Sequence, residues 1–349
     1  MKIMQIITLS ELGGAQSVVI NLSNALSENN EVIVVAGEGD GKLWQLLDKR
    51  IKQIKVKSLK RAFLPLHDFF TLFAFIKLYI HHKPDIIQLH SSKAGLLGRL
   101  VFPKKKTIYT VHGFDSIRVA YRKYLFLEKL LKNRCNKIVA VSKYDEQNLI
   151  AEGINKQVCC VYNGIYKSKE NNINLDIPPK YTKKVLCIAR LSKPKRFDVF
   201  LKTALLLPEY AFIWIGNQEI VENLPENIFC LGNLPNAGAF NQQADLFILP
   251  SNYEGLPIVI IEAMSFGKPI VASNVGGIAE IVINNENGYT VENNPVIFAE
   301  KIKYILENSV IYTQFSENSQ RKFHKHLTVE KMLNEYMHIY QELIKEKQK

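Results

Sequence analysis

The chain has 349 residues, of which 47% are hydrophobic and 22% charged, a composition typical of a globular protein of about two domains. This composition excludes a disordered or low-complexity chain, and the first residues lack the apolar core and cleavage site of a signal peptide, so we expect a cytosolic protein. The net charge is +12, and the whole excess lies in residues 1–166, while residues 167–349 are balanced. A basic first half is expected to meet an anionic partner, either a membrane surface or a nucleic acid.

Strand-like runs alternate with helical stretches throughout the first half. This alternation predicts a parallel, doubly wound α/β sheet, in which ligands bind at the carboxyl ends of the strands where the strand order reverses. The expected strands are 3–9, 32–36, 51–56, 85–89, 107–111, 137–141 and 158–162, and the helices are expected to begin near Ala15, Leu66, Lys93, Val119 and Lys143.

Two of these strand ends carry candidate functional residues. The first strand is followed by Gly13 and Gly14, a pair that lets a backbone approach a phosphate closely, although such a pair is more often a tight turn and is no Gly-x-Gly-x-x-Gly fingerprint. His112 follows strand 107–111, at the edge where the topology places substrate. A histidine at this position is equally often a structural hydrogen-bonding residue.

Two segments of the first half combine aromatic and basic side chains. Residues 60–83 are nearly long enough to span a bilayer, but the charges of Asp68 and Lys77 argue against a spanning helix. A helix lying in a membrane interface and a helix buried in the core both remain open for this segment. In residues 118–137, apolar side chains recur at near-helical spacing with charges between them.

The second half begins after a stretch without periodicity, residues 163–184, which we interpret as an interdomain linker. A second βα series follows, with strands at 185–189, 212–216, 246–249 and 269–272. The first of these strands runs into Arg190, and Lys195 stands near the start of the next helix. A basic loop is usually a solvated surface, yet these two side chains have the donors that bind phosphate.

Two carboxylates flank a helix expected over residues 257–266, with Pro257 in its first turn. Glu254 stands just before this helix, and Glu262 lies within it among apolar residues. One interpretation is that Glu254 is an exposed loop residue and Glu262 is paired with an internal Arg or Lys. The other is that both accept hydrogen bonds from sugar hydroxyls beside an anion bound at the helix N-terminus.

Taken together, these motifs make the sequence resemble the retaining glycosyltransferases of family 4, which have the GT-B fold. The resemblance covers nearly the whole chain, and its most specific part is the Glu-x7-Glu segment at 254–262 with its Glu-Gly-Leu-Pro and Glu-Ala-Met setting. The other matching segments are 13–14, 110–113, 141–143, 163–165, 189–195, 232, 244–245 and 250–280. One departure is Arg196, where family members often have Gly, and this residue could add to the anion site.

The resemblance implies two Rossmann-like domains facing each other across a cleft. We expect an acceptor-binding domain at 1–165, a nucleotide-sugar-binding domain at 166–328 and a C-terminal helix at 329–349 that returns to the first domain. It also implies that Arg190 and Lys195 bind the donor diphosphate, Glu254 the hydroxyls of the donor sugar, Glu262 the ribose, and His112 the sugar near the reacting carbon. The further expected donor contacts are Gly13, Gly14, Leu234, Leu256, Pro257 and Ile258.

By the same resemblance, the protein moves a hexose or N-acetylhexosamine from a nucleotide-diphosphate sugar, a UDP-sugar before GDP-mannose, to a saccharide acceptor in bacterial surface polysaccharide synthesis. No metal and no cofactor is expected, because the cationic pair and the helix N-terminus can stabilise the leaving phosphate. A lipid-linked acceptor at the anionic inner face of the cell membrane would account for the basic half. The alternatives are another GT-B nucleotide-sugar enzyme, a phosphorylase or an epimerase, and a nucleic-acid-binding protein, for which no recognition motif is present.

Overall fold

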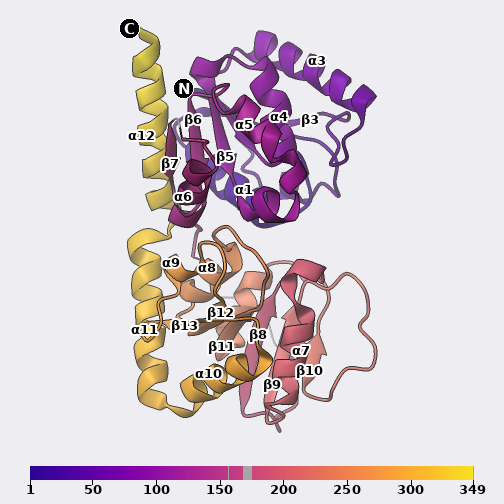
Figure 1. Cartoon of the computed structure of the whole chain (residues 1–349), viewed down its shortest axis with the longest axis vertical. Coiled ribbons are helices and arrows are strands. Elements are labelled where there is room, and N and C mark those ends of the chain that lie inside the picture. The colour runs from indigo at the N-terminus through magenta and orange to yellow at the C-terminus, as the bar shows by residue number, and fades with distance from the viewer. Residues whose placement is uncertain (156, 168–174, 349) are drawn as a thin grey trace. The chain divides into compact units, whose positions relative to one another are not determined.

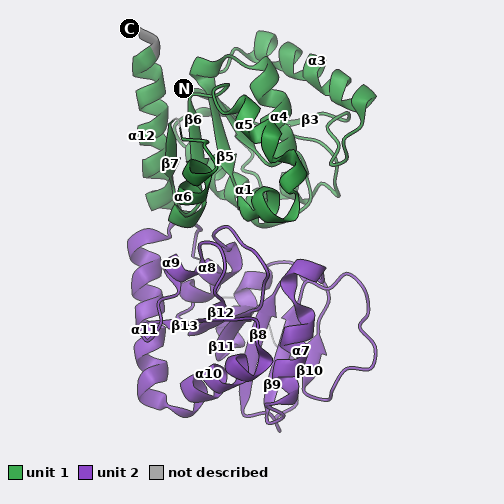
Figure 2. Cartoon of the chain, in the orientation of Figure 1, with its two compact units in different colours: residues 1–164, 329–349 green, residues 165–328 purple. Residues whose placement is uncertain are grey.

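The computed structural model describes residues 1–155, 157–167 and 175–348 and divides the chain into two compact units (Figures 1 and 2). Unit 1 comprises Met1–Gly164 and Val329–Lys349, and unit 2 comprises Ile165–Thr328. The centre of the expected linker, residues 168–174, lies outside the described residues. The cleft between the domains stays a prediction, and each unit is described by itself.

Unit 1 contains a seven-stranded parallel sheet with the order β3-β2-β1-β4-β5-β6-β7, as the alternating pattern predicts. Its strands are β1 (Lys2–Ile7), β2 (Glu31–Ala36), β3 (Lys52–Lys55), β4 (Ile86–His90), β5 (Thr107–Val111), β6 (Lys137–Ala140) and β7 (Val158–Cys160). Its α-helices are α1 (Gly14–Leu26), α2 (Lys42–Gln45), α3 (Pro65–His82), α4 (Ser92–Val101), α5 (Leu125–Leu131), α6 (Lys143–Ala151) and α12 (Val329–Gln348).

The strand order of unit 1 reverses between β1 and β4, which pair in parallel from Ile3 and Ile86 onward. The loops after β1 and β4 therefore lie side by side at the edge where doubly wound sheets bind ligands. Ser91, directly after β4, has a φ of 73°, which is uncommon for a residue with a side chain. Its hydroxyl pairs with that of Thr8 at 2.7 Å, which joins the two loops.

Helix α3 is not buried in the core, so the structure does not support the core-helix interpretation of residues 60–83. Only Thr71, Phe75 and His82 are buried in it. Phe75 stacks on Phe102 at a centroid distance of 5.3 Å, and this contact attaches the helix to the core. The remaining large apolar side chains on its outer face are exposed: Leu66, Phe69, Phe70, Phe73, Ile76 and Ile80.

The helix expected near Val119 begins six residues later, at Leu125. Residues Ser116–Ala120 form a single π-helical turn and Arg122–Tyr124 a 3₁₀ turn. Arg118, within the π-helical turn, pairs with Asp115 at 2.7 Å and with the Tyr144 hydroxyl at 2.9 Å. The contact with Tyr144 joins this turn to α6, a long-range interaction that the local sequence pattern does not show.

Unit 2 contains a six-stranded parallel sheet with the order β10-β9-β8-β11-β12-β13. Its strands are β8 (Lys183–Ile188), β9 (Tyr210–Ile215), β10 (Ile228–Cys230), β11 (Leu246–Leu249), β12 (Ile270–Ser273) and β13 (Gly288–Val291). Its α-helices are α7 (Phe197–Leu205), α8 (Ile258–Ser265), α9 (Ile278–Ile281), α10 (Pro295–Glu307) and α11 (Ser309–His326). The sequence pattern missed the two edge strands: β10 has only three residues, and β13 (Gly-Tyr-Thr-Val) lacks the continuous apolar run of the equally short β11.

The strand order of unit 2 reverses between β8 and β11. Arg190 follows β8, and the segment that carries Glu254 follows β11, so the predicted phosphate ligands and the predicted carboxylate stand at this reversal. Helix α8 begins one residue after Pro257, which is its N-cap rather than part of its first turn.

Candidate active site

The two loops at the strand reversal of unit 2 are bound to each other. The amide of Asn252 donates to the carbonyl of Pro194 at 2.8 Å, and Lys195 forms an ion pair with Glu254. Arg196 donates from Nη1 to Oδ1 of Asn252 at 3.3 Å. These contacts hold the cationic loop after β8 against the carboxylate loop after β11.

Glu254 is not the exposed loop residue of the first interpretation. Its side chain is 11% exposed, and Oε1 accepts from the Ser251 hydroxyl at 2.7 Å in addition to Lys195. Gly276, with φ 57°, packs under it: a Cβ at this position would lie 2.0 Å from the Glu254 carbonyl oxygen. Glycine at 276 is therefore required for the loop to keep its course.

The carboxylate of Glu262 has no hydrogen-bond or ion-pair partner among the residues that the structure describes, so the expected alternative of an internal Arg or Lys partner is wrong. Burial raises the pKa of this carboxyl from 4.5 to about 7. Gly238, in the 3₁₀ segment Ala237–Gln243, lies against the carboxyl group. Because it has no partner in the described chain, the carboxyl group of Glu262 can accept hydrogen bonds from the hydroxyl groups of a ligand.

The other predicted donor contacts of unit 2 surround these loops. Arg190 is exposed at the end of β8, and Leu234 is half-buried on the loop after β10. Leu256 and Ile258 are buried at 3% and 6% exposure, so a ligand reaches their backbone rather than their side chains. Pro257 has no N–H to donate.

An open cavity of about 610 Å³ is lined by the cationic loop and by Asn252. Arg196, which adopts a left-handed conformation with φ 44°, lines it where family members often have Gly. Its guanidinium makes two 2.8 Å hydrogen bonds to the two carboxylate oxygens of Asp198. The guanidinium charge is thus already paired, which weakens the expectation that Arg196 adds to the anion site.

In unit 1, Gly13 is the N-cap of α1 and Gly14 its first residue. A Cβ on Gly14 would meet no atom within 4 Å, so no internal packing requires glycine there. His112 is half-buried at the end of β5, and its Nε2 lies 2.8 Å from Nδ1 of His90. Gly13, Gly14 and His112 thus lie at the carboxyl edge of the unit 1 sheet, and the other predicted residues lie at that of unit 2.

Sequence reasoning overlooked His90 and Ser91 at the end of β4. A signal was present, because Gln88 and His90 alternate with apolar residues in an otherwise apolar strand, and such positions point to one face of the sheet.

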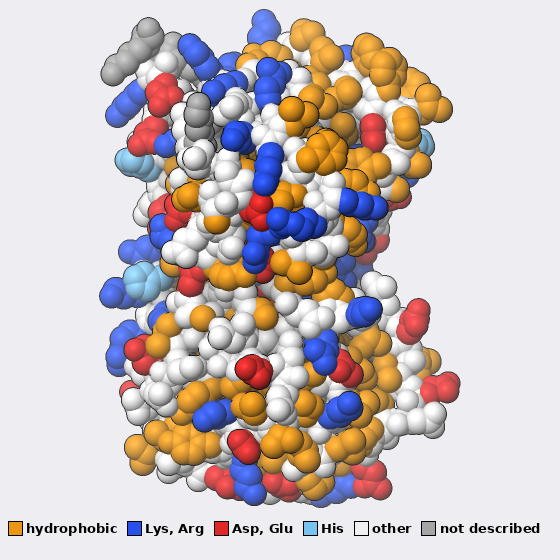
Figure 3. Space-filling view, in the orientation of Figure 1, with side chains coloured by type: hydrophobic (Ala, Val, Ile, Leu, Met, Phe, Trp, Pro, Cys, Tyr) orange, Lys and Arg blue, Asp and Glu red, His pale blue; other side chains and the backbone are white. Residues whose placement is uncertain are grey.

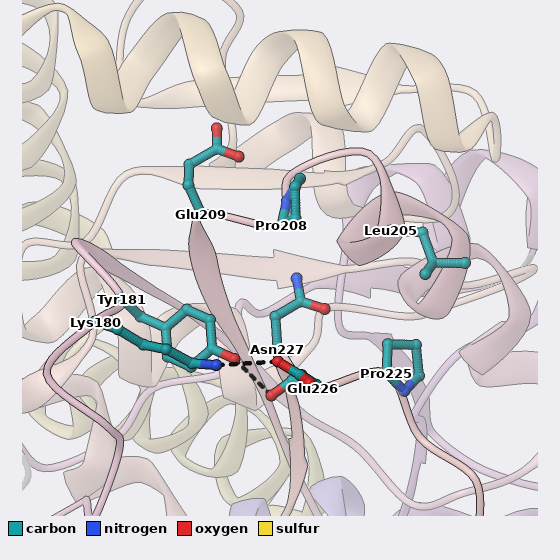
Figure 4. Close-up of a pocket in the computed structure, with 8 residues that line it drawn as sticks. All are labelled: Lys180, Tyr181, Leu205, Pro208, Glu209, Pro225, Glu226 and Asn227. Carbon is teal, nitrogen blue, oxygen red and sulfur yellow. Dashed lines mark hydrogen bonds and ion pairs between the residues drawn. The ribbon is translucent and has the colours of Figure 1, made fainter.

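A second cavity of unit 2, of about 300 Å³, lies at the amino ends of β8, β9 and β10 (Figure 4). Several of its polar groups are already paired: Lys180 with Glu226 at 3.1 Å, and the Tyr181 hydroxyl with the Glu226 carbonyl at 2.6 Å. Because ligands of doubly wound sheets bind at the opposite strand ends, this cavity is no candidate for the active site.

Comparison with known proteins shows to which family this chain belongs. The family described as "Glycosyltransferase Family 4" matches residues 12–169, and "Glycosyl transferases group 1" matches residues 168–322. The O-antigen biosynthesis glycosyltransferase WbnH of Escherichia coli is 31% identical over 332 residues, which cover 91% of this chain and 94% of that protein. The chain is a family 4 glycosyltransferase.

A second relative of this glycosyltransferase is the UDP-Gal:alpha-D-GlcNAc-diphosphoundecaprenol alpha-1,3-galactosyltransferase of Escherichia coli, 24% identical over 98% of this chain and 97% of that protein. Among solved structures, Anabaena Alr3699/HepE in complex with UDP and glucose superposes with a TM-score of 0.81 at 20% identity, covering 98% of this chain and all of that one. The predicted GT-B class of the glycosyltransferase, with two parallel α/β domains, is thereby confirmed.

Proposed function

We propose that the enzyme transfers a hexose or N-acetylhexosamine from a UDP-sugar to a lipid-linked saccharide, with retention of the anomeric configuration. The observation that carries this proposal is the pair of carboxylates at the strand reversal of unit 2. Glu254 is held by a lysine and a serine, whereas Glu262 has no partner in the described chain. A UDP donor is favoured over GDP-mannose by the UDP-Gal donor in the name of the galactosyltransferase relative and by the UDP bound to the Anabaena protein.

The reaction leaves negative charge on the departing diphosphate. Arg190, Lys195 and the amides at the start of α8 stand at one sheet edge, and donors fixed in advance stabilise such charge as it develops. In this proposal they act in place of a metal ion, and no cofactor takes part. The departing phosphate accepts the acceptor proton on the same face of the sugar, and this one-face reaction retains the configuration.

A donor screen tests this function. The enzyme is incubated with UDP- and GDP-sugars and a lipid-linked saccharide extract, and nucleotide release and product linkage are measured. We expect release of UDP from one hexose or N-acetylhexosamine donor and an anomeric configuration equal to that of the donor. Release of GDP alone would contradict the donor assignment, and an inverted product would contradict retention.

We further propose that unit 1 binds an anionic membrane through the outer face of α3. The six exposed apolar side chains of this face recur every three or four residues, so they form one continuous row along the helix. Hydrophobic side chains gather over α3 in the space-filling view, with Lys and Arg side chains beside them (Figure 3). No helix among the described residues could cross a bilayer.

Basic side chains adjoin both ends of this row. Phe63 stacks on Tyr124 at 5.4 Å, next to Lys123, and Lys106 lies over the ring of Tyr79 at 5.4 Å, next to Lys104 and Lys105. Apolar residues flanked by cations match a bilayer with anionic headgroups better than a protein partner of mixed charge. The relative whose name includes a diphosphoundecaprenol acceptor supports a substrate at such a surface.

A further inference from the structure

A chain of polar side chains crosses the interior of unit 1 from the C-terminal helix to His112. Gln5 on β1, Gln88 and His90 on β4 and Thr110 on β5 are fully buried, each at 0% exposure. Helix α12 adds Tyr336 and Tyr340, at 1% and 0% exposure. Polar groups are costly to bury unless each has its hydrogen-bond partner, so their arrangement is specific.

The contacts of this chain run from one residue to the next without a gap. His112 Nε2 lies 2.8 Å from His90 Nδ1, and His90 Nε2 lies 2.6 Å from Gln5 Oε1. Gln5 Nε2 donates at 3.2 Å both to Gln88 Oε1 and to the Tyr340 hydroxyl, and Tyr340 in turn donates to Gln88 Oε1. Gln88 Nε2 donates at 2.7 Å to the Thr110 hydroxyl, which lies 3.4 Å from that of Tyr336.

The direction of these hydrogen bonds follows from the amides. A carbonyl oxygen only accepts, so Gln5 Oε1 requires His90 to carry its proton on Nε2, which leaves Nδ1 of His90 as an acceptor. His112 must then carry its own proton on Nε2. Turning the Gln5 amide alone would place two carbonyl oxygens, those of Gln5 and Gln88, 3.2 Å apart, so the orientations of these two amides are coupled and together determine the tautomers of both histidines.

Both rings are neutral near pH 7. Burial lowers the pKa of His112 to about 4, and burial together with the charge of His112 lowers the pKa of His90 well below its usual range. The two rings lie nearly parallel, with their centroids 5.2 Å apart and an angle of 26° between their planes. A neutral histidine has one donor and one acceptor nitrogen, so its tautomer determines what it can offer a ligand.

We propose that His90 is a positioning residue that holds His112 in its Nε2–H tautomer, and that Gln5, fixed by Tyr340 of α12, sets the orientation of His90. Nδ1 of His112, which has no partner among the described residues, is then the acceptor that remains for a hydroxyl of the donor sugar. The sugar contact rests on the proposed function. The tautomer does not.

The tautomer is measured by two-bond ¹H–¹⁵N correlation spectra of the free enzyme labelled with ¹⁵N-histidine, which distinguish Nδ1–H from Nε2–H. The enzyme has 8 histidines, and the signals of His112 and His90 are assigned by their loss in His112→Gln and His90→Phe. We expect both rings as Nε2–H. In Gln5→Leu, which touches His90 but not His112, the His112 signals should shift toward a mixture of tautomers.

Transfer kinetics supply the second measurement. His90→Phe and Gln5→Leu should lower kcat by about tenfold or more, because a misplaced contact at the reacting group is costly, while affinity for free UDP stays unchanged. Tyr336→Phe is the matched control, since it removes a buried hydroxyl at the far end of the chain, and it should alter neither readout.

An Nδ1–H tautomer of His112 in the wild type overturns the proposal. An Nε2–H tautomer of His112 that stays unchanged in Gln5→Leu and His90→Phe overturns it as well. A shifted tautomer with wild-type kcat overturns the role in transfer. Should the wild type use no sugar nucleotide at all, the proposed function fails, and the spectra of the free enzyme still decide the tautomer.

Discussion

The carboxyl group of Glu262 lies directly against Gly238. A Cβ at position 238 would stand 2.7 Å from the carboxyl carbon and 3.0 Å from each carboxyl oxygen. Gly238 has an ordinary backbone conformation, so glycine is required there by space rather than by φ. The end of a flexible side chain can move aside, so a methyl group at 238 should displace the carboxylate without unfolding the domain.

Gly238→Ala should therefore weaken nucleotide binding about as much as Glu262→Gln does, since a carboxylate bound to hydroxyls contributes on the order of 1.5–3 kcal/mol. Calorimetric titration with free UDP measures both variants, and thermal unfolding serves as the control. A Gly238→Ala enzyme with wild-type UDP affinity would show that the carboxylate does not contact the nucleotide.

The raised pKa of Glu262 predicts opposite effects of pH on stability and on binding. Because the folded state binds this proton more tightly than the unfolded state, stability is lost as the pH rises from 4.5 to about 7, and the loss is complete above that range. Glu262→Gln should therefore raise the Tm of the free enzyme at pH 8 by a few degrees and have little effect at pH 4.

Affinity for UDP should increase in the wild type between pH 6 and pH 8, because the ionised carboxylate is the stronger acceptor. Ionisation of the nucleotide phosphate also changes UDP affinity in this pH range. Glu262→Gln is therefore the control that separates the contribution of the carboxylate. Parallel pH profiles in the two enzymes would contradict this prediction.

Arg190→Ala and Lys195→Ala should each lower the turnover number by about tenfold or more, since in the proposed function each removes a donor from the developing charge. Lys193→Ala, a basic neighbour on the same loop, should have little effect. Initial rates with the accepted donor and circular dichroism spectra distinguish a loss of catalysis from a loss of fold. If both variants keep wild-type rates, these two residues do not bind the diphosphate.

The sequence predicted the parts of this structure that depend on local pattern. Strands such as 246–249 are short apolar runs, and the switch-point rule then placed Glu254 and Arg190 at one edge. It did not predict the polar chain behind His112, because Gln5, His90 and Tyr340 are joined only when three distant segments pack together. The sequence also did not decide whether α3 is buried. An apolar helical pattern does not show whether its apolar face packs against the core or is exposed to solvent.

Glu254→Gln should damage sugar transfer more than nucleotide binding, in contrast to Glu262→Gln. In the free enzyme Glu254 forms an ion pair with Lys195. A neutral amide would keep the hydrogen bond from Ser251 but lose the negative charge that, in the proposed function, accepts hydrogen bonds from the sugar hydroxyls. The ratio of kcat to UDP affinity separates the two variants. Equal losses of UDP affinity in both would overturn this division of roles.

Binding to membranes should depend on both charge and the apolar row of α3. Cosedimentation with anionic vesicles is expected at low salt and should weaken at high salt, because each well-placed Lys or Arg contributes about 1 kcal/mol. Lys104→Glu combined with Lys105→Glu should weaken the salt-sensitive part. Phe70→Ser combined with Phe73→Ser should remove the part that persists at high salt.

Leu205→Ser combined with Leu206→Ser is the matched control for the apolar variant, because these two side chains are exposed to a similar extent on unit 2. It should bind anionic vesicles like the wild type, and both proteins should bind neutral vesicles much more weakly, through the salt-resistant part alone. Each variant should release UDP from the donor in solution at the wild-type rate, since none of the substituted residues lies at the candidate site. If the wild type ignores anionic vesicles and glycosylates a soluble acidic saccharide efficiently, the basic face serves that acceptor and α3 contacts another protein.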